Sequence, residues 1–128
     1  QAESLPYRVF DIGSGYQAWV GKGAHQNDKL TLHHARPFDI WLHARGSPGS
    51  HVVIRLKGRD DTPPPVVMER AAALAAWYSK QRGSSLVPVI HSPRKHVRKP
   101  KGAPPGSVRV LREETLLVAP NVWKPSSA

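Results

Sequence analysis

Residues 39–55, DIWLHARGSPGSHVVIR, constrain the fold more than any other part of the chain. Two runs with strand-like alternation flank a loop of glycine, proline and serine, which predicts two β-strands joined by a turn. One face of each run is apolar, and we expect it to face a core. The opposite faces carry acidic, aromatic, imidazole and guanidinium groups, which packing alone does not require; they are Asp39, Trp41, His43 and Arg45, and then His51, Val53, Arg55 and Lys57. If the strands pair as a hairpin, both rows lie on one sheet face.

The rest of the chain reads as further strands and two helices. Strands are expected at 7–11 and 16–20, joined by a tight turn, and at 86–90, where Pro88 suggests an edge or an irregular start. A short helix should begin after Asn27 as its capping residue and end near Arg36, because the residue before Pro37 avoids helical geometry. The alanine-rich segment 66–80 predicts a long buried helix.

The final third is predicted to hold a loop, a hairpin and a tail. Residues 92–106 form the loop, and 108–111 pair with 115–119. The ordered core should span about 7–120, with 121–128 as a tail. The sequence therefore predicts an α+β domain with a mainly antiparallel sheet, one long buried helix and one short helix.

The length and composition of the chain predict one folded domain. Its 128 residues suffice for a single core. We expect no membrane span, and the lack of cysteine excludes disulfides and thiolate metal sites and fits a cytoplasmic location. Because the chain starts with Gln rather than Met, we expect a fragment of a longer protein.

The positive charge is concentrated in one segment. The net charge is +10, and residues 70–112 contain ten Lys or Arg and no Asp or Glu, so the rest of the chain is neutral. A solubilising surface would intersperse both signs. The asymmetry favours a polyanionic partner, most often nucleic acid.

Three features could bind nucleic acid. The loop 46–50 could hold a phosphate through its amides and the hydroxyls of Ser47 and Ser50, or be a plain tight turn. Arg45, His51 and Arg55 flank this loop and are expected, with His43 on the same strand face, to contact the nucleic acid. Trp41 could stack on an unpaired base or pack in the interior. The proline-stiffened loop near residue 98 could track a phosphate backbone, and its basic residues are Arg94, Lys95, Arg98, Lys99 and Lys101.

A catalytic role for residues 39–51 has less support than a role in nucleic-acid binding. Asp39 and His43 should lie about 13 Å apart along an extended strand, too far for a direct hydrogen bond. His43 and His51 could approach each other across the hairpin, but no metal-ligand spacing supports a metal site, and no cofactor motif is present. An RNA-modifying enzyme using Asp39, His43 and His51, and a general DNA- or polyanion-binding domain, remain alternatives to a non-catalytic RNA-binding module.

Four motifs in order also resemble the NFACT-R domain: NDKLT (27–31), residues 39–55, ERAAALAAWYS (69–79) and HVRKPKGAPPGSV (96–108). The resemblance covers about residues 7–120. It implies an RNA-binding domain of ribosome-associated quality-control factors, which bind the large ribosomal subunit blocked by peptidyl-tRNA; free-standing NFACT-R proteins also exist. It marks Asp39, Trp41, His43, Arg55 and the loops 46–51 and 98–102 as characteristic positions. The implied partners are rRNA or tRNA on the large subunit.

Overall fold

The computed structural model describes residues 4–126. Its centre is a six-stranded sheet in which every pair of neighbours is antiparallel. The spatial order of the strands is β1 (Tyr7–Gly13), β2 (Tyr16–Gly21), β4 (Val52–Ile54), β3 (Ile40–Ala44), β5 (Val87–Pro93) and β8 (Glu114–Val118). The expected α+β architecture is confirmed, and β3 and β4 form the expected antiparallel pair.

Helix α2 (Pro65–Trp77) covers one face of the sheet. Pro65 occupies the first turn, where its missing N–H costs no hydrogen bond. The alanines let the helix approach the strands closely, and the side chains at this interface form the main core. Buried members on the helix are Val67, Ala71, Ala72, Leu74, Ala75 and Ala76. The long buried helix is therefore confirmed, although it ends at Trp77 rather than near Lys80.

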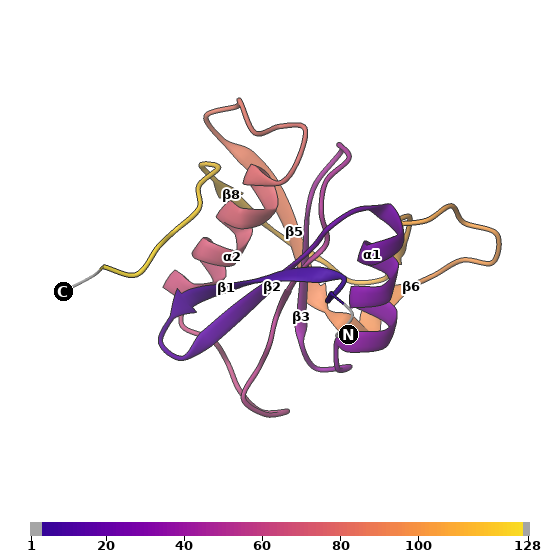
Figure 1. The fold of residues 1–128 in the computed structure, drawn as a ribbon, viewed down its shortest axis with the longest axis horizontal. Coiled ribbons are helices and arrows are strands. Elements are labelled where there is room, and N and C mark those ends of the chain that lie inside the picture. The colour runs from indigo at the N-terminus through magenta and orange to yellow at the C-terminus, as the bar shows by residue number, and fades with distance from the viewer. Residues whose placement is uncertain (1–3, 127–128) are drawn as a thin grey trace.

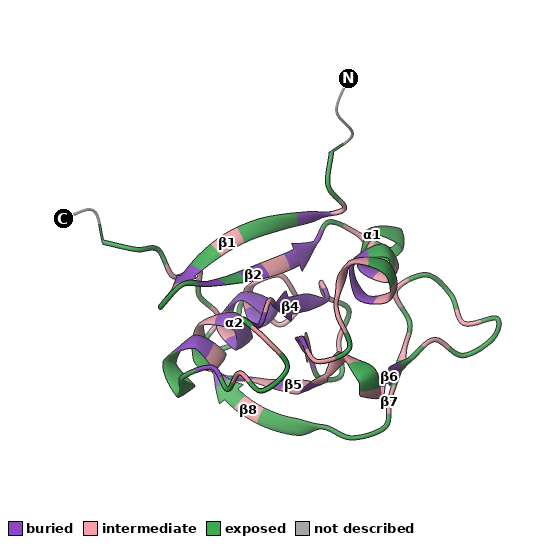
Figure 2. Cartoon of the chain, turned by 90° about the horizontal axis from the view of Figure 1, so that it is seen from below, coloured by how far each residue is buried: buried purple, intermediate pink, exposed green. Residues whose placement is uncertain are grey.

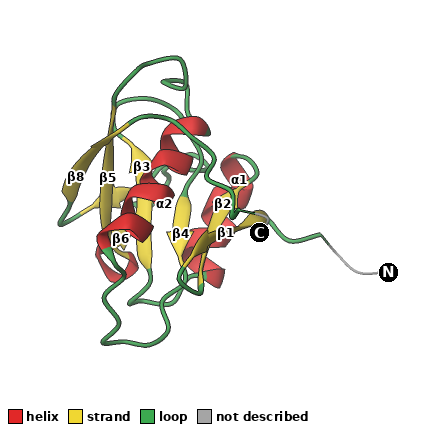
Figure 3. Cartoon of the chain, turned by 90° about the vertical axis from the view of Figure 1, so that its left-hand side faces the viewer, coloured by secondary structure: helices red, strands yellow, loops and turns green. Residues whose placement is uncertain are grey.

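The opposite face is covered by a helix and a small second sheet (Figures 1 and 3). α1 (Ala24–Lys29) continues into one π-helical turn, η1 (Leu30–His34). A 3-10 turn, η2 (Arg94–His96), leads to the two-stranded sheet of β6 (Val97–Arg98) and β7 (Arg109–Val110). Together they enclose a smaller core of Tyr7, Leu30, Trp41, Val53 and Val97. The mixed face of residues 39–57 is thus mostly an interior surface.

The short helix starts earlier than predicted. It begins at Ala24, so Asn27 is a buried helical residue and not the cap. Its side chain bonds to the 49–51 segment instead: Oδ1 accepts from the His51 amide at 3.1 Å, and Nδ2 donates to the Gly49 carbonyl at 3.5 Å. A Cβ at Gly21 would lie 1.9 Å from Asn27 Oδ1, so that position has room only for glycine.

The predicted C-terminal hairpin is wrong. β7 pairs with β6, while β8 pairs with β5, with Val87 opposite Val118. β5 is therefore an internal strand rather than an edge, and the edges are β1 and β8 (Figure 2). Pro88 is tolerated as the second residue of β5, where its carbonyl accepts from the Arg45 amide. The expected loop 92–106 is shorter, because β5 continues to Pro93.

The segment after β8 lies against α2. The Asn121 amide donates to the Ala73 carbonyl at 3.2 Å, and the Arg70 guanidinium stacks 3.7 Å from the Trp123 ring centroid. The predicted tail therefore contacts the domain at least to Trp123. None of the helices within residues 4–126 has the length and apolar character needed to cross a membrane.

Candidate functional site

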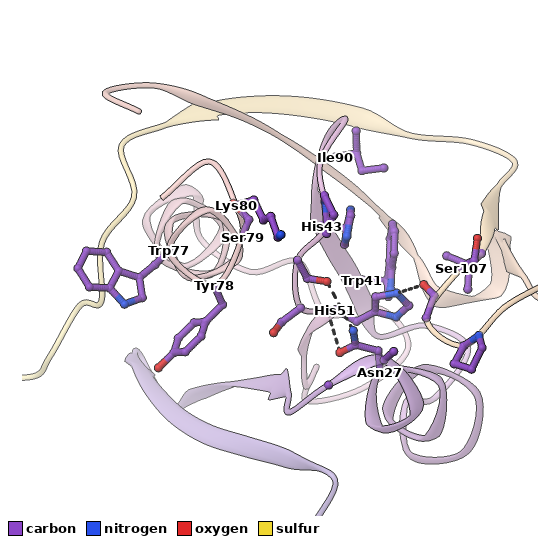
Figure 4. A pocket seen from close by; sticks show the side chains of 18 of the residues that line it. Asn27, Trp41, His43, His51, Trp77, Tyr78, Ser79, Lys80, Ile90 and Ser107 are labelled. Atoms are coloured by element: carbon purple, nitrogen blue, oxygen red, sulfur yellow. Dashed lines mark hydrogen bonds between the residues drawn. The ribbon is translucent and has the colours of Figure 1, made fainter. Parts of the chain in front are cut away.

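A pocket of about 800 Å³ opens where β3, the loop after it, the end of α2 and the loop before β7 converge (Figure 4). Among residues 4–126, no carboxylate lines it. Apart from the amide of Asn27, the lining side chains are apolar, hydroxylic or basic, and those that carry the argument are Trp41, His43, His51, Lys80, Arg82 and Ile90.

His51 lies at the buried edge of this pocket and has both ring nitrogens occupied. Nε2 lies 2.9 Å from the Gly106 carbonyl, which can only accept, so Nε2 carries the proton. Nδ1 therefore accepts from the Thr31 hydroxyl at 2.7 Å. Burial, with a smaller contribution from the charge of His43, lowers the pKa of His51 to about 4. A neutral imidazole with no free lone pair is a structural element, not a general base.

His43 is the accessible member of the histidine pair. Its ring centroid is 5.7 Å from that of His51, which confirms the expected approach across the hairpin. The ring is stacked over Trp41 with centroids 5.9 Å apart, and it is half-buried at the pocket wall. Burial lowers the pKa of His43 below its ordinary value, so at neutral pH it too is uncharged.

Trp41 is 1% exposed and packs in the smaller core. The packing alternative is therefore the correct one, since a buried ring offers no free face to a base. Its indole Nε1–H is a donor only. Among the described residues, it is the one buried side-chain polar atom that has no hydrogen-bond partner.

The 46–50 loop is fastened to the end of α2. The Ser50 amide donates to the Tyr78 carbonyl at 2.9 Å, and the Lys80 amide donates to the Pro48 carbonyl at 3.0 Å. The Ser50 hydroxyl donates to the Gly21 carbonyl, and the Ser47 hydroxyl accepts from Gln81. These donors and acceptors close the loop on the fold, which favours the tight-turn interpretation over a free phosphate cradle.

Asp39 is fully buried and holds the start of β3 in place. Its carboxylate accepts from the Arg36 and Leu56 amides at 2.8 and 3.0 Å, and it pairs with the guanidinium of Arg36 at 3.2 Å. Arg55 lies 3.9 Å away. None of these partners is a histidine. With His51 also fully bonded, the catalytic alternative of Asp39, His43 and His51 keeps only His43 with an accessible ring.

Several of the expected RNA-binding cations have partners within the fold. Arg45 pairs with Glu113 at 2.9 Å, and Arg55 stacks over Trp19. Arg94 donates to the Thr31 and Val97 carbonyls, and its burial lowers the pKa of the guanidinium. Lys99 pairs with Asp28 at 3.0 Å and donates to the Pro104 and Ser107 carbonyls, which closes the β6–β7 loop.

Other cations remain exposed. Within residues 4–126, no carboxylate lies at ion-pair distance from the five exposed cations on and beside the β6–β7 hairpin, which we call the basic arm: Lys95, Arg98, Lys101, Arg109 and Arg112. The described residues also contain no group of three side chains suited to a metal ion.

Comparison with known proteins decides what kind of domain carries this arm. A family model described as the NFACT protein RNA binding domain matches residues 7–111. The chain belongs to this family. The Rqc2 homolog RqcH of Bacillus subtilis (strain 168) is 44% identical over 113 residues, which are 88% of this chain and 19% of that protein. The Rqc2 homolog RqcH of Streptococcus suis (strain 05ZYH33) is 44% identical over 103 residues, 79% of this chain and 18% of that protein.

A solved structure shows the same fold. It is the C-terminal part of the fibronectin/fibrinogen-binding protein from Streptococcus suis, with a TM-score of 0.84 and 39% identity. The match covers 94% of this chain and 47% of that one. This NFACT RNA-binding domain therefore spans less than a fifth of the length of the curated relatives it matches.

Several functional candidates of this NFACT domain were not predicted from its sequence. Lys80 and Arg82 at the pocket rim, and Arg109 and Arg112 on the basic arm, were not among the predicted binding residues. Their signal was present, because all four fall inside the acid-free segment 70–112. The pocket itself could not be predicted from the sequence, since its walls come from segments far apart in the chain.

Proposed function

We propose that this domain binds RNA as the module of a larger ribosome-associated quality-control factor, with rRNA or tRNA on the large ribosomal subunit as its ligand in the cytoplasm. Its membership in an RNA-binding family supports the ligand class. The relatives named Rqc2 homologs support the setting. We assign RNA binding to the domain by itself. We assign association with the ribosome to the larger factor that contains the domain.

The basic arm carries this proposal. Its five cations are exposed and unpaired within the described residues, so none has to give up an ion pair to meet a phosphate. The hairpin that bears them is anchored through Lys99 and Asp28, which limits the ordering cost of binding. Phosphate contacts of this kind supply affinity and orientation rather than sequence selectivity.

Salt dependence of RNA binding tests the proposal. Five phosphate contacts predict a log–log slope of affinity against salt of roughly −3.5 to −4.5. The measurement uses fluorescence anisotropy with a structured RNA hairpin, and duplex DNA and heparin serve as competitors. A near-zero slope would contradict the proposal. Equal competition by all three polyanions would favour general polyanion binding instead.

A further inference from the structure

The walls of the pocket are partly apolar, a property that the binding of phosphates alone does not require. Its wall includes Ile90, Val108 and the half-buried ring of His43, and the part of the chain that the structure describes places no carboxylate there. The indole N–H of Trp41, which also lines it, lacks an acceptor. Because that N–H is buried, the half-buried ring of His43 is the polar group that we expect a ligand in the recess to meet.

Two cations stand at the rim of the pocket on the side of α2. Lys80 and Arg82 are both exposed, and Figure 4 shows the Lys80 side chain extending from the end of α2 toward His43. Their backbone is held in place: the Lys80 amide donates to Pro48, and the Arg82 amide donates to Ser79 at 3.2 Å. The Arg82 guanidinium is also stacked 3.9 Å from the Trp77 ring centroid. The rim therefore offers positive charge on an anchored backbone beside the recess.

We propose that the pocket receives one unpaired nucleotide of a bound RNA, with its base in the recess beside His43 and its phosphate at Lys80 and Arg82. This inference rests on the proposed function and adds the element that the basic arm lacks, namely recognition of an unstacked base.

The dimensions and chemistry of the pocket favour a nucleotide. Its volume of about 800 Å³ falls in the range of roughly 300–1,000 Å³ for small-molecule sites. Bases present carbonyl and ring-nitrogen acceptors together with flat apolar faces. A paired base cannot enter a pocket, whereas bases in loops and bulges can be splayed out and read by a protein. The β6–β7 loop forms one wall through Gly106 and Ser107, so RNA on the basic arm passes beside the opening.

Three RNA hairpins that differ at one position test this inference by fluorescence anisotropy. One has a single bulged adenosine, the second has an abasic residue in the bulge, and the third has no bulge. A base contact worth about 1–3 kcal/mol predicts that the adenosine hairpin binds roughly 5- to 150-fold more tightly than the abasic one. Equal affinities for these two RNAs would overturn the inference. Continued binding of the unbulged hairpin would then leave the proposed function intact, whereas loss of all RNA binding would remove both.

A variant whose new side chain fills the pocket provides a second test, with a matched control outside the pocket. Ser107 lines the pocket with an exposed side chain, and its hydrogen bonds to Pro104 and Lys99 use the backbone only. Ser107→Trp should reduce the ratio of adenosine to abasic affinity to about one. Ser84→Trp, at an exposed serine outside the pocket, is the control and should keep the full ratio. Two results would overturn the inference. One is an unchanged ratio of adenosine to abasic affinity in Ser107→Trp, and the other is equal displacement of the adenosine and abasic hairpins by an acidic peptide.

Discussion

The Nδ1 atom of His51 accepts a hydrogen bond from the Thr31 hydroxyl at 2.7 Å, while Nε2–H donates to the Gly106 carbonyl. One imidazole thereby joins the helical turn η1, the start of β4 and the loop before β7. Protonation of Nδ1 would place a positive charge in a buried position, and burial disfavours that charge, so the neutral form belongs to the folded state.

This link predicts a loss of stability in mild acid. The pKa of His51 is about 4 in the folded state and about 6.5 in the unfolded chain, so its contribution is complete above pH 6.5 and decreases as the pH falls toward 4. Between pH 7.5 and 5 the free energy of unfolding should fall by about 2 kcal/mol from this residue. Urea unfolding of the parent and of His51→Gln at both pH values measures it. Equal pH dependence in the two proteins would show that His51 is not responsible.

Asp39 is predicted to act on stability and not on RNA binding. Asp39→Asn removes the charge that pairs with Arg36 and leaves the two backbone donors with a weaker acceptor. The free energy of unfolding should fall by about 2–4 kcal/mol. RNA affinity at a temperature where the variant is folded should stay within about twofold of the parent. A stable variant with lost RNA binding would instead assign Asp39 to the binding surface.

The contact between Gly49 and the end of α2 predicts a strict size limit. A Cβ at Gly49 would lie 2.9 Å from Ser79 Cβ, so Gly49→Ala must push the loop away from α2 and should lower stability by about 1–3 kcal/mol. Gly83→Ala is the matched control, because a Cβ there meets no atom within 4 Å. Thermal unfolding of the two variants compares them directly. Equal melting temperatures would mean that the loop adapts without cost.

The sequence predicted best where the information was local. Alternation in residues 40–44 assigned Leu42 and Ala44 to the core face correctly, and it also brought His43 near His51. The same alternation could not show that the opposite face was covered, because the covering elements, η1 and β6–β7, come from distant segments. Trp41 and His51 therefore looked available for binding when they were interior.

Long-range pairing explains the remaining differences. A strand at 115–119 was expected, but only the fold shows that its partner is β5 rather than the segment 108–111. Asn27 resembled a helix cap in sequence, yet its side chain is used across 24 residues to hold His51. Lys99 belongs to the predicted basic loop, but its ion pair with Asp28, 71 residues away, makes it an anchor of that loop.

The central claim is that the basic arm contacts RNA phosphates, and a matched pair of triple variants tests it most directly. One variant replaces Lys95, Arg98 and Lys101 by alanine, and the other replaces the exposed Lys22, Lys29 and Arg59, so the charge change is identical. In RNA-binding titrations over a range of salt concentrations, the first should reduce the magnitude of the log–log slope by about 2 to 3, and the second should keep the slope of the parent. Equal slopes in the two variants would contradict the account.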